Sequence, residues 1–205
     1  MHNAPFYVYL AGPVSSNTPL QATYWRESAA GMLAPHGITA VSPLREKASL
    51  FTEGQQIGVD YRQYGESPDA KASSIFMRDH FDVIHADVVL ANLTWLDNAH
   101  MASTVPEHEG QKEVFAVADV PIPSVGTDFE LAWAWQAHIP IILVAPPQNY
   151  YRKHPFTVSV ASVVFDELAP ACQWIVRNFA PYRPSTVSII KERLERQEKK
   201  GGFNR

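Results

Sequence analysis

The sequence predicts an α/β fold with an open parallel sheet flanked by helices on both faces, of the flavodoxin-like or Rossmann-like kind. Three observations predict it. Short apolar, β-forming runs recur at residues 6–11, 37–43, 86–93, 141–144 and 158–165. Segments with helix start and stop signals separate these runs. The first strand, helix and second strand fit within residues 6–43, which makes a βαβ unit.

The first strand, residues 6–11, is expected to end at the turn that Gly12 begins. Thr18 is expected to cap the following helix, with Pro19 at the first helical position. We expect this helix to end before Pro35, because a proline disfavours the helical conformation of the residue that precedes it.

The middle and end of the chain give weaker signals. Residues 44–70 show little periodicity and are expected to form a long active-site loop or a lid. Ser73 or Ser74 is expected to cap the helix before the third strand. Residues 150–156 are expected to form a loop, and residues 167–179 a helix.

Thr127 and Glu130 have the spacing of a capping box, in which the threonine oxygen accepts from a first-turn amide and the glutamate reaches back to the cap. The helix that follows is apolar almost throughout residues 129–135, so burial on most of its sides is expected. Glu130 therefore has two interpretations. It is either a helix cap or a nucleophile in the first turn, where the amide dipoles would favour its ionised form.

We expect one domain at residues 1–180, with an insertion at about residues 94–123, followed by a charged helix or tail at residues 181–205. The 205 residues are 46% apolar and contain no glycine- or serine-rich linker. Cys172 has apolar neighbours and is expected to be a buried thiol. No segment resembles a signal peptide or a membrane span, so a cytoplasmic location is expected.

Several function classes are disfavoured by the sequence. A formal net charge of −4 argues against an extended nucleic-acid surface, so the ligand is expected to be a small molecule. The chain lacks GxGxxG, P-loop and GxSxG motifs, which argues against a dinucleotide-binding oxidoreductase, a P-loop NTPase and a standard α/β-hydrolase. The histidines and acids of residues 100–113 fit no regular metal spacing. Neither a metal site nor a cofactor is expected.

Polar residues are expected at the edge formed by the carboxyl ends of the strands, where open α/β sheets bind ligands. They lie in three motifs: Tyr9-Leu10-Ala11-Gly12-Pro13, Arg78-Asp79 shortly before Ala86-Asp87-Val88-Val89, and Ser124-x-Gly126-Thr127-x-x-Glu130-Leu131. In order and spacing, these motifs resemble the nucleoside 2-deoxyribosyltransferase family over roughly residues 6–168.

The resemblance implies cleavage of the N-glycosidic bond of a 2-deoxynucleoside and transfer of the sugar to a second base. It implies that Glu130 is the nucleophile of a covalent deoxyribosyl-glutamate, that Asp79 transfers the proton of the base, and that Tyr9 holds the nucleophile. This is the logic of a retaining glycosidase. An acid role for Asp79 requires partial burial that raises its pKa.

The resemblance also implies substrate contacts and partners. The implied substrate-binding residues are Gly12, Ser124, Gly126, Thr127 and Asp128. The implied partners are a nucleoside or nucleotide, an acceptor base and further copies of the chain, because family members are usually oligomers. Neither polymeric nucleic acid nor a membrane is expected among the partners.

Two alternatives stay open. A nucleoside 5′-monophosphate N-glycosidase would give the sugar to water, and Ser15, Ser16 and Asn17 could donate hydrogen bonds to its phosphate at a helix N-terminus. A non-catalytic nucleotide-binding sensor would keep the fold and need neither carboxylate. The chain also departs from the family pattern at Ala132, where glycine is common.

Overall fold

The computed structural model describes residues 5–15, 17–47, 51–52, 54–55, 57–58, 60, 68, 71–94 and 124–180. The predicted insertion, apart from Thr94, and the predicted tail at residues 181–205 lie outside this part of the chain, as do residues 100–113. No helix within the described ranges is long and apolar enough to cross a membrane.

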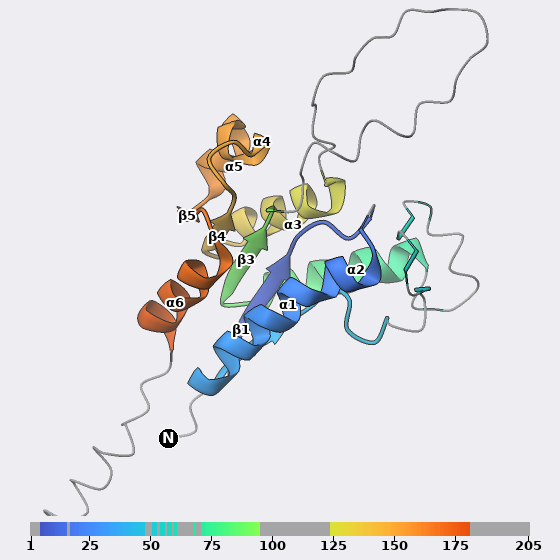
Figure 1. Ribbon diagram of the computed structural model, residues 1–205, viewed down its shortest axis with the longest axis horizontal. Helices are drawn as coiled ribbons and strands as arrows, with labels where there is room; N and C mark the ends of the chain where they lie inside the picture. The colour runs from blue at the N-terminus through green and yellow to red at the C-terminus, as the bar shows by residue number, and fades with distance from the viewer. Residues whose placement is uncertain are drawn as a thin grey trace, which may run out of the picture.

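The described strands form a parallel five-stranded sheet (Figure 1), which confirms the predicted fold class. Its strands are β1 (Phe6–Ala11), β2 (Ile38–Val41), β3 (Val88–Asn92), β4 (Ile141–Val144) and β5 (Val163–Phe165), in the order β2-β1-β3-β4-β5. In register, Tyr9 of β1 lies between Val41 of β2 and Val89 of β3. The chain leaves β1 towards β2 and later returns to β3 on the other side, so the strand order reverses between β1 and β3.

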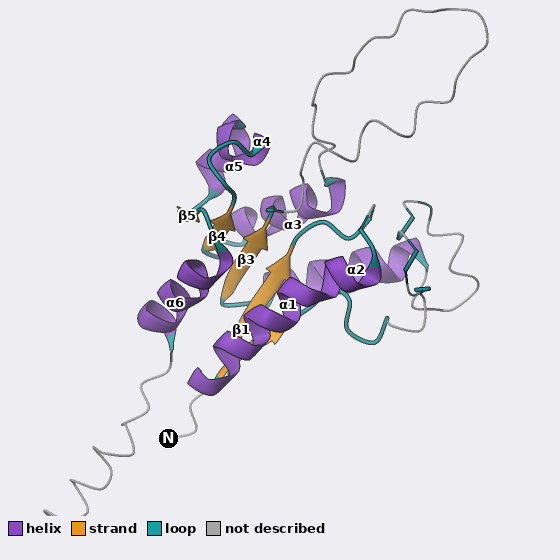
Figure 2. Ribbon diagram, viewed as in Figure 1, coloured by secondary structure: helices purple, strands orange, loops and turns teal. Residues whose placement is uncertain are grey.

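Helices cover both faces of the sheet (Figure 2). They are α1 (Pro19–Leu33), α2 (Ala72–Ile84), α3 (Val125–Gln136), α4 (Tyr150–Lys153), α5 (Pro155–Val160) and α6 (Leu168–Phe179). Because alternate residues of a strand point to opposite faces, Val8 and Leu10 pack in the layer of α1 and α6, whereas Tyr9 and Ala11 pack in the layer of α2 and α3. This alternation places the Tyr9 side chain on the α3 side of the sheet.

Helix α1 begins as predicted. The Thr18 hydroxyl oxygen accepts a hydrogen bond from the Gln21 amide at 3.2 Å, and the Gln21 side chain accepts one from the Thr18 amide at 2.9 Å. This is a complete capping box. The α-helix ends at Leu33, before Pro35, and a 3₁₀ turn, η1 (Ala34–His36), leads to β2.

The predicted cap of α2 is wrong. The helix begins at Ala72 with Lys71 as its N-cap, so neither Ser73 nor Ser74 caps it. Long-range contacts place it instead: Arg45 forms a bidentate ion pair with Asp82. Tertiary contacts of this kind routinely override local signals.

The predictions for residues 150–165 are partly wrong. The expected loop contains the short helix α4, and the expected strand at residues 158–165 begins inside the helix α5, with only Val163–Phe165 paired in the sheet. Pro155 stands at the first position of α5, where its fixed backbone angle suits a helix start. This local preference outweighs the β-propensity of the valines that follow, because β-propensity depends strongly on context.

Helix α3 is less buried than its apolar sequence predicts. Its Val125, Phe129 and Trp135 side chains are 67%, 49% and 61% exposed. The neighbouring helix α2 also exposes apolar side chains, including Phe76, and the Phe76 and Trp133 rings meet edge to face with centroids 5.0 Å apart. Together α2 and α3 therefore present an apolar surface with these aromatic side chains on it.

Candidate active site

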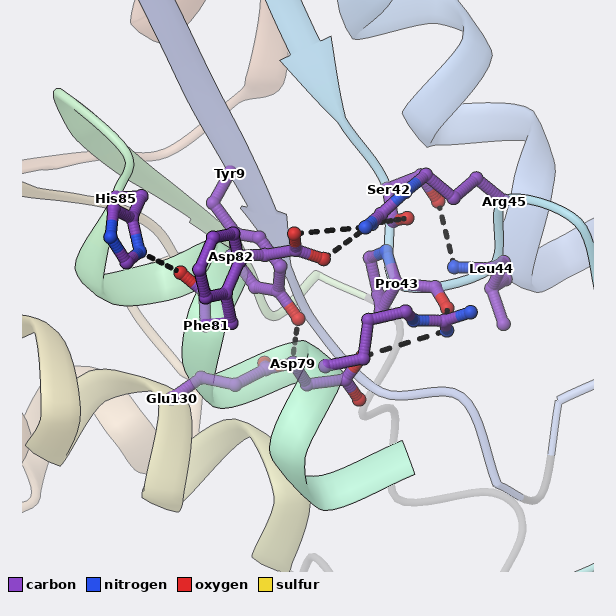
Figure 3. Close-up of polar contacts among 11 residues, drawn as sticks. Tyr9, Ser42, Pro43, Leu44, Arg45, Asp79, Phe81, Asp82, His85 and Glu130 are labelled. Carbon is purple, nitrogen blue, oxygen red and sulfur yellow. Dashed lines mark hydrogen bonds and ion pairs between the residues drawn. The ribbon is translucent and has the colours of Figure 1, made fainter. Parts of the chain in front are cut away.

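Three predicted site residues meet on the α2 and α3 side of the sheet, close to the reversal point between β1 and β3 (Figure 3). Tyr9 reaches from β1, Asp79 from α2 and Glu130 from α3. The Tyr9 hydroxyl donates a hydrogen bond of 2.6 Å to Glu130 Oε1, across 121 residues of sequence. Tyr9 is fully buried and Glu130 is 6% exposed. Open α/β sheets place their ligand sites at this kind of position.

The capping interpretation of Glu130 is wrong. Helix α3 begins at Val125 with Ser124 as its N-cap, so Glu130 lies in the second turn and cannot reach back to the cap. The Thr127 hydroxyl donates to Ser124 Oγ at 2.9 Å. The glutamate side chain is therefore free of the helix start and points toward Tyr9.

The surroundings of Glu130 favour its neutral form. Its pKa is raised to about 8, chiefly by burial and further by the neighbouring Asp79, although the hydrogen bond from Tyr9, the charge of Arg26 and the nearby Gly12 amide act in the opposite direction. The expectation that helix amides hold this carboxylate ionised is thus wrong for the protein without ligand, because burial outweighs them.

This raised pKa predicts a stability effect. A carboxyl group whose folded pKa lies above its unfolded value destabilises the fold once it ionises, so stability falls as pH rises from about 4.5 through about 8. Glu130→Gln stays neutral and keeps an oxygen for Tyr9. We expect its advantage in melting temperature over the wild type to grow from about pH 5 to about pH 9, by the equivalent of a few kcal/mol. Thermal denaturation across this pH range measures the difference in melting temperature between the variant and the wild type, with Glu27→Gln as the control at an exposed residue. A difference that does not change with pH, or the same pH-dependent difference in Glu27→Gln, contradicts the prediction.

Asp79 has the environment that a proton donor needs. Burial raises its pKa, as the sequence predicts, while the charges of Lys47 and then Arg78 act in the opposite direction. Lys47 follows β2 and is only 5% exposed. Arg78 Nη2 lies 3.7 Å from Asp79 Oδ1 and donates a hydrogen bond to the Pro43 carbonyl at 2.6 Å. The Asp79 pKa therefore depends on two opposed effects: burial raises it, and two nearby cations lower it.

Two carboxyl oxygens at the site are buried without a hydrogen-bond partner among the described residues: Glu130 Oε2 and Asp79 Oδ1. Buried polar atoms are nearly always paired, and exceptions of this kind cluster at functional sites. Tyr9 itself stays protonated, since burial and then the Glu130 charge raise its pKa well above the usual value. The arrangement supplies two acidic groups and one fixed donor.

Gly12 is required by close packing. A Cβ atom at this position would lie 2.7 Å from the Asn92 carbonyl oxygen and 2.9 Å from Trp25 Cζ2. Real Cβ atoms do not approach this closely, and the Asn92 carbonyl belongs to β3 and cannot move cheaply.

Gly12→Ala is therefore expected to destabilise the protein by about 1–3 kcal/mol. Gly31→Ala is the matched control, because nothing lies within 4 Å of a Cβ there and alanine favours a helix. Chemical denaturation of both variants measures the difference. Equal stability of the two variants would show that the turn after β1 has room for a methyl group.

The other predicted contact residues build the start of α3. The Ser124 amide donates to the Tyr151 hydroxyl at 2.7 Å, and that hydroxyl also hydrogen-bonds the Asp128 carboxyl. Thr127 is buried and bonded to Ser124. Gly126 has open space around its missing side chain. The direct side-chain hydrogen bond to Glu130 thus comes from Tyr9, while Ser124, Thr127 and Asp128 are engaged around the helix start.

Sequence reasoning missed three residues of this neighbourhood: Arg26, Lys47 and Tyr151. Arg26 is 2% exposed and donates to carbonyls near the end of β1. Lys47 lies in the stretch that has no periodic pattern. Each of the three acts through contacts between segments that are distant in the sequence. Only Arg26 had a signal in the sequence, as a charged residue among apolar neighbours on α1.

Comparison with known proteins points to structures of the same kind. No family model matches the sequence, and a search of curated proteins finds no match. Among solved structures, a 2-deoxyribosyltransferase from Bacillus psychrosaccharolyticus is 15% identical, with a TM-score of 0.49 over 86% of this chain and 99% of that one. The CMP N-glycosidase BcmB of Clostridium botulinum is 16% identical, with a TM-score of 0.41 over 82% and 97%. BlsM is 17% identical, with a TM-score of 0.50 over 85% and 90%.

The likeness is one of fold. The resemblance expected from the sequence is confirmed at that level. What the site does must be argued from its own residues, because one fold supports many activities.

Proposed function

We propose that the protein cleaves the N-glycosidic bond of 2-deoxynucleosides and transfers the sugar, through a covalent deoxyribosyl-glutamate on Glu130. One observation carries this proposal most: a buried glutamate has one oxygen fixed by the Tyr9 hydroxyl at 2.6 Å and the other oxygen buried without a hydrogen-bond partner among the described residues. A second carboxyl group, Asp79, lies close enough to influence the Glu130 pKa. Two carboxyl groups of this kind are what glycosidic-bond cleavage with a covalent intermediate needs.

In the first half of the reaction, the free oxygen of Glu130 attacks C1′ of the sugar as the bond from C1′ to the base nitrogen breaks. The electron pair of that bond goes to the base, which takes a proton from Asp79. In the second half, a nitrogen of the acceptor base attacks C1′ and loses its proton to the Asp79 carboxylate. Glu130 then leaves as a carboxylate, so both groups return to their starting states.

The active form has Glu130 ionised and Asp79 protonated. Both groups have raised pKa values because both are buried, and the charge of Asp79 adds to the rise at Glu130. The pair therefore holds one proton over a range of pH, and its titration belongs to the pair rather than to either residue. Tyr9 supports the ionised form of Glu130 by donating a hydrogen bond to Oε1.

The monophosphate alternative depends on the start of α1. There, Gln21 and Thr18 satisfy each other's amides in the capping box, and the Asn17 side-chain amide donates to the Pro13 carbonyl at 3.5 Å. These groups are less available to a phosphate than the sequence alone suggested. Ser15 is exposed, and Ser16 lies outside the described residues. The engagement of Asn17, Thr18 and Gln21 in hydrogen bonds within the protein favours nucleosides over their monophosphates as substrates.

The test is a panel of deoxynucleosides and deoxynucleoside monophosphates, each incubated with and without a free acceptor base. We expect base exchange with nucleoside donors. Base release without exchange would support the hydrolase, and faster reaction of monophosphates would support the alternative substrate. Absence of release with every donor would support a nucleotide-binding sensor.

Three further expectations remain proposals: a cytoplasmic location, a single domain over residues 1–180, and a homo-oligomer. For the oligomer we propose a second copy of the chain against the apolar surface of α2 and α3, where Phe129 and Trp135 are exposed. Exposed apolar surface on this scale is typical of an association site. Sedimentation velocity measures the mass, and a monomer at all concentrations contradicts the proposal.

A further inference from the structure

Arg26 is a buried charge next to the site. It lies in the middle of α1, only 2% exposed, with its guanidinium carbon 4.4 Å from the centre of the Trp25 ring. Burial lowers its pKa to about 10, so it stays charged at neutral pH. A buried arginine is costly unless its donors are satisfied, which makes the identity of its partners informative.

The partners of Arg26 are main-chain carbonyls. It donates to Ala22 within α1, to Leu10 at 3.3 Å and to Gly12 at 2.8 Å. The Leu10 carbonyl belongs to the peptide unit before the one that joins residues 11 and 12, and the Gly12 carbonyl belongs to the unit after it. Arg26 thus clamps the chain on both sides of the peptide unit that carries the Gly12 amide.

That amide lies near enough to Glu130 to lower the pKa of its carboxyl group. Its direction depends on the two peptide units that flank it, because the peptide group is planar and adjacent units are linked through only two soft angles. Gly12 permits the close approach that the clamp needs, since a Cβ there would press on Trp25 and Asn92. Arg26 and Gly12 together therefore set where this donor points.

The charged and titratable groups that act on Glu130 come from four elements. Tyr9 lies on β1, Asp79 on α2, Arg26 on α1 and Lys47 after β2. Arg26 attracts the ionised form of Glu130, whereas Asp79 repels it when it is ionised. Arg26 is the cation with the strongest effect on the Glu130 carboxyl; the Lys47 charge acts chiefly on Asp79.

We propose that Arg26 is a positioning residue for Glu130: it orients the Gly12 amide toward the carboxylate and supplies the charge that favours the ionised nucleophile over ionised Asp79. This inference rests on the proposed function of Glu130 as the nucleophile. It gives a residue of the opposite sheet layer a part in setting the protonation of Glu130.

A merely structural role for Arg26 makes a different prediction. An arginine that only ties α1 to β1 would lower stability when replaced and leave the titration of Glu130 where it was. A positioning role moves that titration. The measurement must therefore report the protonation of Glu130 itself, in the folded protein and without substrate.

The experiment is a pH titration of the glutamate side-chain carboxyl carbons by NMR, with the Glu130 signal assigned as the one lost in Glu130→Gln. In Arg26→Gln we expect the Glu130 midpoint to rise by about one pH unit or more, because the Arg26 charge lowers the Glu130 pKa and a neighbouring opposite charge lowers a carboxyl pKa by about 1–3 units. In Arg26→Lys we expect a smaller rise, because an ammonium keeps the charge but cannot bridge two carbonyls in one plane.

Arg152→Gln is the matched control. Arg152 also donates to a carbonyl at a strand end, that of Ala145 at 2.9 Å, and it pairs with Asp166 away from the site. It should lose stability without moving the Glu130 midpoint. An unchanged midpoint in folded Arg26→Gln overturns the inference. Should that variant fail to fold, an unchanged midpoint in Arg26→Lys, together with an unaltered pH profile of any base release, overturns it equally.

The NMR readout separates this inference from the proposed function. A shifted midpoint in a protein that releases no base would leave Arg26 as the residue that controls Glu130 and reject the enzyme. With base release present, the limb of the rate profile that rises as Glu130 ionises is expected to shift to higher pH in Arg26→Gln by the same amount, with little change in KM. A uniform loss of kcat at every pH contradicts the positioning role.

Discussion

Glu130→Ala is expected to lower the rate of base release and base exchange by about 1,000-fold or more. The glutamate is the group that forms the covalent bond in the proposed reaction, and removal of a nucleophile eliminates that route. The alanine variant also removes the acceptor of the 2.6 Å hydrogen bond from Tyr9, whose hydroxyl is then buried without that partner. Initial rates with the best nucleoside donor measure the loss.

Two controls separate chemistry from folding in that experiment. Glu130→Gln keeps the volume and an acceptor for Tyr9, so it should be folded and equally inactive. Glu27→Gln changes an exposed glutamate of α1 and should retain full activity. Mass spectrometry of the wild type quenched during turnover should show one added deoxyribosyl group, and Glu130→Ala should show none. Undiminished activity in Glu130→Ala would reject the covalent mechanism.

The sheet could be predicted because its strands carry a direct signal. β1 and β4 are short, wholly apolar runs, bounded by glycine or proline, and such runs have few other interpretations in a chain of this composition. The pairing of Tyr9 with Glu130 was expected only through the family resemblance. The structure supports it through strand alternation, which turns Tyr9 to the face that α3 covers.

The start of α3 could not be predicted because two local signals there both point to a later start. Gly126 disfavours a helix interior, and Thr127 with Glu130 matches a capping box, so both signals place the start too late. The structure begins the helix at Val125, where the Tyr151 hydroxyl accepts the Ser124 amide. That contact joins segments 27 residues apart, which no local pattern contains. Because the helix starts about one turn earlier than the capping box predicts, Glu130 is not part of its cap and is free to reach Tyr9.

The cations around the site were missed for a related reason. Lys47 and Arg26 do not stand in motifs, and their effects come from burial and from main-chain partners on other elements. A sequence shows that a charge is present but not that it is buried. The interpretation of Glu130 as ionised failed on the same point, because desolvation depends on the packed surroundings of a residue and outweighs the helix amides here.

Asp79→Asn is expected to lower base release by about 100- to 1,000-fold for donors with ordinary bases, because an amide cannot give the leaving nitrogen a proton. The loss should shrink to a few-fold for a deoxyriboside whose leaving group is acidic and departs without a proton. In the wild type, activity should fall at high pH as Asp79 ionises, and Asp79→Asn should remove this fall. Because burial raises the Asp79 pKa, the fall should occur at a higher pH than the titration of an exposed aspartate. Rates across pH for both donor types measure these effects.

Asp166→Asn is the matched control for that experiment, since its carboxylate pairs with Arg152 away from the site. It should leave both donors and the pH profile unchanged. The two donor types decide what Asp79 does: a positioning or purely electrostatic residue would slow both to the same degree, whereas a proton donor slows only the one that needs a proton. Equal losses for the two donors would leave Glu130 as the nucleophile and move the acid role elsewhere in the site, with Lys47, buried beside Asp79, as the next residue to replace.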